Sequence, residues 1–182
     1  VTYVTSPEAP FEETRYFDAH VRAGHLKALW TRHLSPRREL IAQAYYDRYD
    51  RRELPIRGLI QTLDADFQVS TGWAAANQFV WGAGYRRTFD DYDGSFTMQL
   101  VPDKRTVHLV SAFAHAEVAP LPGALHLSAG TKVEHNSYTG LEVQPNVRLW
   151  WGPVADHGLW LAMARAVRTP SRADHDLRAM VQ

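Results

Sequence analysis

The chain has 182 residues, with 20 Lys and Arg against 20 Asp and Glu, and it has no cysteine. This length fits one domain or a piece of a larger one, and the balanced charge argues against a nucleic-acid-binding protein. The lack of cysteine excludes disulfide bonds, thiol catalysis and cysteine-ligated zinc. No apolar run approaches the ~18 residues of a transmembrane helix, although the strands of a transmembrane β-barrel would escape that test.

The ends of the sequence predict a segment of a longer precursor. The first residues, VTYVTSPEAP, lack the basic and apolar regions of a signal peptide. The last residues, DHDLRAMVQ, stop in the middle of a pattern. We therefore expect residues 1–182 to form one partial domain.

Eight strands are predicted, because apolar and polar residues alternate in stretches that Gly, Pro or Ser separates. In chain order these strands cover residues 16–34, 38–50, 57–68, 76–89, 104–118, 124–136, 141–151 and 158–168. The alternation is clearest in the seventh strand, where odd positions are apolar and even positions are polar. A helix over residues 37–53 is the alternative that helix propensity leaves open.

The links between the predicted strands alternate between two kinds. Those at 35–37, 70–75, 119–123 and 152–157 are short and turn-like, whereas those at 51–56, 88–103 and 135–140, and the residues after 168, are longer or more polar. Short periplasmic turns that alternate with longer extracellular loops are typical of outer-membrane barrels. The expected fold class is all-β, an antiparallel up-and-down meander of about eight strands that forms part of a transmembrane β-barrel.

Three motifs near the end of the chain resemble the barrel of TonB-dependent outer-membrane receptors. They are G-x-K-x-E-H-N at residues 130–136, T-G-x-E-x-Q-P-x-x-R-L at 139–149 and R-A-x-R-T-P-S-R at 165–172. The resemblance implies a barrel of about 22 strands that an N-terminal plug occludes. This chain would supply about the middle third of that barrel, without the plug and without the segment that contacts TonB.

The function that this resemblance implies is uptake of a scarce nutrient, such as a ferric siderophore, with energy from TonB. Its implied partners are TonB, the plug domain of the full-length receptor, the small ligand and the lipid of a Gram-negative outer membrane. A passive porin-like or structural outer-membrane barrel is one alternative. A soluble eight-stranded ligand-binding barrel is the other.

No catalytic, metal or cofactor site is predicted, so an enzyme is a distant third possibility. The sequence has no G-x-S-x-G, H-E-x-x-H, P-loop or G-x-G-x-x-G motif, and its nine histidines lack metal-ligand spacing. The acidic stretch at residues 90–94 lacks the first and last ligands of a calcium loop, so we expect a solvated loop there.

Two sets of candidate site residues follow from polarity and position. The residues that could contact a ligand lie at a strand end and in the basic stretch after 164, namely His135, Asn136, Tyr138, Arg168 and Arg172. Those arginines could instead pair with Asp174 and Asp176, which we favour. The residues expected to face the lumen, where contacts with a plug are favoured over contacts with a ligand, are Asp64, Asp66, Lys132, Glu134, Glu142, Gln144, Asn146 and Arg148.

Overall fold

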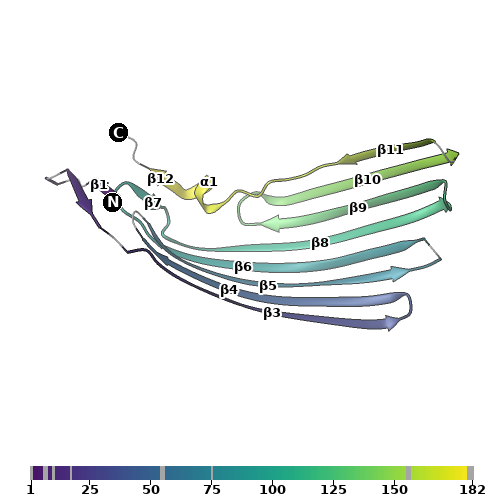
Figure 1. Cartoon of the computed structure of the whole chain (residues 1–182), viewed down its shortest axis with the longest axis horizontal. Helices are drawn as coiled ribbons and strands as arrows, with labels where there is room; N and C mark the ends of the chain where they lie inside the picture. Colours follow the sequence, from purple (N-terminus) through teal and green to yellow (C-terminus); the bar gives the residue numbers. More distant parts are fainter. Residues whose placement is uncertain are drawn as a thin grey trace.

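The computed structural model describes residues 2–5, 8–9, 11–16, 18–53, 56–74, 76–154 and 157–179. Eight strands form one open antiparallel sheet, in which they follow one another as a meander (Figure 1). They are β3 (His20–Ser35), β4 (Arg38–Arg52), β5 (Arg57–Gly72), β6 (Gln78–Asp93), β8 (Lys104–Leu121), β9 (Leu125–Asn136), β10 (Gly140–Val154) and β11 (His157–Ala164). The predicted all-β meander of about eight strands is confirmed.

Five short elements that the sequence pattern does not predict accompany this sheet. They are β1 (Thr2–Thr5), β2 (Glu12–Arg15), β7 (Met98–Leu100), α1 (Arg172–Asp176) and β12 (Leu177–Ala179). Strand β1 pairs with β2, and β12 pairs with β7. Elements of three to five residues are too short to show a period in the sequence.

Two expectations for individual segments are wrong. The helical alternative over residues 37–53 fails because β4 pairs along its whole length with β3 on one side and β5 on the other. The acidic stretch at 90–94 is not a solvated loop, because β6 continues to Asp93 and Asp90 is only 2% exposed. In both segments, pairing with neighbouring strands determines the structure. The local sequence pattern does not reveal such pairing.

The strict alternation of short and long links is also wrong. At one end of the sheet lie the links from β3 to β4, β5 to β6 and β8 to β9, and β10 ends and β11 begins at the same end (Figure 1). At the other end, the link from β9 to β10 is the tight turn 137–139, and only the link 94–103 is much longer. Parts of the predicted links, residues 54–55, 75 and 155–156, lie outside the described residues.

The register divides the sheet into an apolar face and a polar face, because residues directly opposite on paired strands point to the same side. Val143, for example, lies opposite Val133, and Val147 lies opposite both Ala129 and Met163. Large exposed side chains on the apolar face include Trp30, Phe67, Trp81, Leu127, Leu141, Val143, Val147, Leu159, Leu161 and Met163. No second layer of the described structure covers this face.

Burial in the described part of the chain is the reverse of that in a water-soluble sheet. The buried side chains are the polar or charged Asp90, Glu134, Asn136 and Asp176, with the apolar Val69, Leu100 and Ala119. Meanwhile Leu141 is 67% exposed and Met163 is 74% exposed. Apolar patches of this extent on a protein surface mark contact with a partner or a membrane.

Candidate functional site

All eight residues predicted to face a lumen lie together on the polar face. Across the sheet, Asp66 is opposite Gly84, Gly84 is opposite Ser111, and Ser111 is opposite Glu134. Glu134 is in turn opposite Glu142. Side chains two residues apart along a strand point to the same face. The other predicted lumen residues therefore lie on this face too, namely Asp64, Lys132, Gln144, Asn146 and Arg148. The shared face is a property of the structure, whereas its identity as a lumen stays a prediction.

Charged side chains on the polar face neutralise one another across or along the strands. The Arg86 guanidinium donates to Asp64 at 2.6 Å, and the Lys132 ammonium donates to Glu134 at 2.7 Å. Arg165 donates to Glu142 at 3.0 Å. Such pairs remove the cost of leaving a charge unpartnered where solvent is limited.

After β11 the chain crosses the polar face as a segment that we call the C-terminal strap, residues 165–179. The strap contains α1 and β12, which lie beside β7 at the end of the sheet where β6 and β8 are joined (Figure 1). On the way, the Thr169 hydroxyl donates to Glu134 at 3.1 Å. The strap therefore covers part of the polar face.

The first turn of α1 is closed within the strap itself. Ser171 is the N-cap, and it forms a capping box with Asp174. Arg168 also donates to Asp174, at 2.9 and 2.8 Å. The backbone N–H and the hydroxyl of Ser171 donate to the Asp174 carboxylate and hold its pKa below the usual value, and Arg168 adds to this effect.

Two arginines and two aspartates form a buried ion-pair cluster between the strap and the sheet. Arg172 of α1 lies 3.0 Å from Asp90 of β6, and Arg105 of β8 donates to Asp176 of α1 at 2.7 Å. Arg172 also pairs with Asp176 within α1. Burial acts to raise the pKa of Asp176, but hydrogen bonds from Arg105, His175 and Arg172 outweigh it and hold that pKa well below its usual value.

The five residues predicted to contact a ligand do not form one site. Asn136 is 1% exposed, and its side chain accepts from the backbone N–H groups of Tyr138 and Thr139 at 2.9 Å. It therefore shapes the turn 137–139. His135, one residue earlier, points to the apolar face, opposite Leu141 and Val110.

The other three of these residues lie near or within the strap. The Tyr138 ring is 4.9 Å from the guanidinium carbon of Arg105 and 5.3 Å from the His175 ring. Arg168 is exposed and bound to Asp174, and Arg172 is committed to the ion-pair cluster. The pairing of Arg168 with Asp174 and of Arg172 with Asp176 is the arrangement that the sequence analysis favours.

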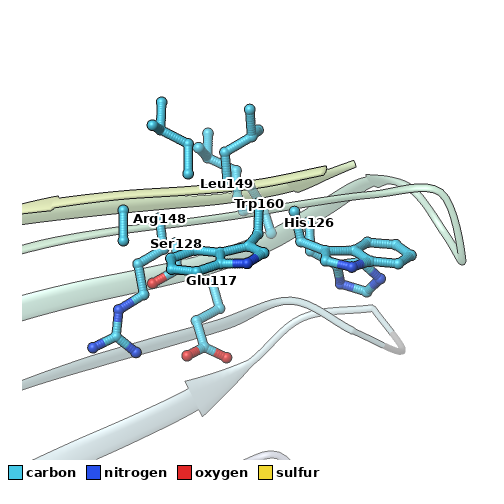
Figure 2. Close-up of a pocket in the computed structure, with 11 residues that line it drawn as sticks. Glu117, His126, Ser128, Arg148, Leu149 and Trp160 are labelled. Carbon is cyan, nitrogen blue, oxygen red and sulfur yellow. The ribbon is translucent and has the colours of Figure 1, made fainter. Parts of the chain in front are cut away.

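The polar face also has an aromatic platform near the tight-turn end of the sheet, which sequence reasoning missed. Trp150 lies opposite Trp160 and 5.4 Å from the His126 ring, in a hollow of about 590 Å³. Figure 2 shows Trp160 together with Arg148, Ser128 and Glu117 on one side of the strands. His126, Trp150 and Trp160 each occupy an even-numbered position on the polar face of their own strand, and a search for aromatic residues at such positions would find them.

Two further features bear on the class of site. Among the described residues, no group of three or more His, Asp or Glu side chains is arranged to hold a metal ion. In the same part of the chain, no helix has the length and apolar character needed to cross a membrane.

Comparison with solved structures supports the fold. The siderophore receptor PirA from Pseudomonas aeruginosa superposes with a TM-score of 0.62 at 12% sequence identity, covering 83% of this chain and 34% of the receptor. The chain thus spans about a third of the length of that receptor. No family model matches the sequence, and no curated protein matches it either. At this identity the likeness shows the fold alone, an antiparallel β-meander that matches part of a β-barrel protein.

Proposed function

We propose that this chain is part of the barrel of a TonB-dependent receptor in the outer membrane of a Gram-negative bacterium. Such a receptor takes up a scarce nutrient, for example a ferric siderophore. The observation that carries the proposal is the pair of opposite faces, one apolar and exposed, the other polar with its charges paired. Lipid on one side and a water-filled, plugged lumen on the other would satisfy both faces.

The backbone of the sheet supports the same proposal. A strand that crosses a membrane needs a hydrogen-bonded partner on each side, because the hydrocarbon offers none. The six inner strands have two partners each, whereas β3 and β11 are edges. In the proposed barrel, other strands of the complete protein pair with these two edges and close the barrel.

The polar face is the surface that the plug domain would contact in this proposal. Its paired charges, such as Asp64 with Arg86 and Lys132 with Glu134, fit a wet protein interface better than a transport site for one ion. Among the residues predicted to contact a ligand, Tyr138 beside the strap and the exposed Arg168 within it stay the candidates, because Asn136 and Arg172 are buried in structural roles and His135 points to the apolar face.

The soluble eight-stranded barrel fits less well. It would have to join β3 to β11, but these two strands lie at opposite edges of the sheet. It would also need its apolar side chains inside and its charges outside. A passive outer-membrane barrel would have the same apolar and polar faces as the proposed receptor. Only a measurement of TonB-dependent uptake distinguishes these two functions.

Uptake under iron limitation tests the proposal. We expect that deleting the complete gene abolishes growth on at least one ferric siderophore, and that deleting the gene for TonB gives the same loss. Entry of the siderophore without TonB would identify a passive barrel. Unchanged growth across a broad panel of iron, haem and cobalamin sources would contradict a role in uptake of these nutrients.

A further inference from the structure

The ion-pair cluster joins the C-terminal strap to the sheet by a reciprocal exchange of charges. The strap contributes Arg172 and Asp176, and the sheet contributes Asp90 and Arg105. Each arginine pairs with an aspartate of the other part, at 3.0 Å for Arg172 with Asp90 and 2.7 Å for Arg105 with Asp176. In this closed arrangement both acids are at least nine-tenths buried and both have a cationic partner.

The same four residues are also placed to pair without the contact between strap and sheet. Asp90 of β6 lies directly opposite Arg105 of β8 in the register. Arg172 and Asp176 are four residues apart in α1, and they already form an ion pair. If the strap lifted away, each part would keep one acid and one arginine close enough to pair.

We propose that the C-terminal strap is a reversible latch on the polar face, with a closed and an open state that both leave every charge of the cluster paired. Breaking a buried ion pair costs free energy because it leaves a charge without a partner. When the four residues exchange partners, no charge is left unpaired, and this cost is avoided. A bistable element with two satisfied arrangements is the physical basis of a switch. This inference rests on the geometry of the cluster and does not require the proposed function.

The remaining ties of the strap are mostly polar. At its start, Arg165 bonds to Glu142 and to the Pro145 carbonyl, and near its end the Asp176 carbonyl accepts from the Val101 N–H. The others include the three-residue pairing of β12 with β7, the hydrogen bond from Thr169 to Glu134, and a 2.6 Å bond from Arg172 to the Pro102 carbonyl. Leu177 of β12 is 41% exposed, so it adds little apolar burial. The Ser171–Asp174 capping box and the Arg172–Asp176 pair hold the turn of α1 itself, and the cluster supplies the most buried link between that turn and the sheet.

Opening would uncover two acidic groups of the polar face. Asp90 is 2% exposed and Glu134 is 6% exposed in the closed state, and the strap contacts both. Glu134 keeps Lys132 as its partner when Thr169 leaves. The latch thus controls access of solutes to this end of the polar face.

The two-state latch predicts that substitutions on its two sides act differently. Arg172→Gln leaves Asp90 unpaired only in the closed state, so the strap opens. Arg105→Gln leaves Asp90 unpaired only in the open state, since Arg172 still pairs with both acids when the strap is closed. The alternative is a static tie, in which the cluster has only the closed arrangement. A static tie predicts that both substitutions loosen the strap, because each removes one link to the sheet.

The experiment measures the distance between spin labels at Ala173→Cys in α1 and Gln68→Cys in β5, in the complete gene product. We expect Arg172→Gln to raise the open fraction about tenfold or more, and Arg105→Gln to leave it unchanged or lower. A second pair of labels, at Gln68→Cys and Asn146→Cys, reports whether the sheet itself stays intact. Asp176→Asn is the second strap variant, and it should also open the strap.

Three results would overturn the latch. Equal opening by Arg172→Gln and Arg105→Gln would make the cluster a static tie. A closed strap in both Arg172→Gln and Asp176→Asn would show that other contacts hold it. Loss of the sheet distance in both strap variants would show that the cluster supports the fold itself.

Discussion

At the scale of single residues, the most buried side chain of the described structure serves a turn. Asn136 is 1% exposed, accepts two backbone hydrogen bonds from the turn 137–139 and donates to the Thr139 hydroxyl at 2.8 Å. Asparagine is suited to this role because its amide imitates a backbone group. Gly140 completes the turn with a φ of +75°, in the region that favours glycine.

Replacing this residue tests its structural role. Asn136→Ala should lower the free energy of unfolding by about 1–3 kcal/mol, because the freed backbone N–H groups of Tyr138 and Thr139 lose their acceptor. The measurement is urea unfolding of the complete gene product in micelles. Gln144→Ala, a half-buried residue of the same face, is the matched control and should change little. Equal effects of the two substitutions would contradict the role assigned to Asn136.

The local sequence pattern predicts the role of a residue when that role depends on its own strand. The prediction fails when the role depends on a partner far along the chain. The eight polar-face residues follow from alternation alone, and the structure places all eight on one face. Asp90 looks like part of an acidic loop because its partner, Arg172, lies far along the chain. Asn136 looks like a ligand contact because hydrogen bonds to a turn leave no signature beyond the residue type.

At the scale of elements, eight strands were predictable because Gly, Pro or Ser separates them and most show a period of two, although 104–118 and 158–168 carry apolar residues on both faces. Their ends moved by up to four residues, as for the first strand, which begins at His20. The turn 137–139 and the elements β7, α1 and β12 were not predictable, since their pairing depends on register and on the crossing of the strap.

Close approach of neighbouring strands at Gly82 gives a test at this scale. A Cβ atom added there would lie 2.3 Å from the Phe67 carbonyl oxygen and 2.8 Å from the Phe113 ring. Gly82→Ala should therefore destabilise the sheet by about 1–3 kcal/mol through overpacking. Gly24→Ala, where an added Cβ meets nothing within 4 Å, should leave stability unchanged or slightly raised.

Thermal unfolding of the two glycine variants beside the unsubstituted protein provides the measurement. If Gly82→Ala were as stable as Gly24→Ala, the strands would not pack as closely as the structure has them. A matched loss in both variants would point to a general effect of replacing glycine in a strand.

At the scale of the whole molecule, the sheet lacks the core that would hold it in water. One face carries large exposed apolar side chains, and the other carries polar groups with paired charges. The sequence contains this division in its alternation. It does not contain what covers each face or what pairs with the edge strands β3 and β11.

The most direct test of the account compares two neighbouring positions at the middle of β10. Val147 lies on the apolar face, and Asn146 lies on the polar face between Gly130 and Ala164. Val147→Arg in the complete gene product should impair insertion into lipid bilayers, since arginine on the lipid face near the midplane costs about 2–4 kcal/mol. Asn146→Arg should insert normally, because Gly130 and Ala164 leave room beside it and this face is wet in the proposed barrel. Equal insertion of the two variants, or a larger defect for Asn146→Arg, would contradict the assignment of the apolar face to lipid.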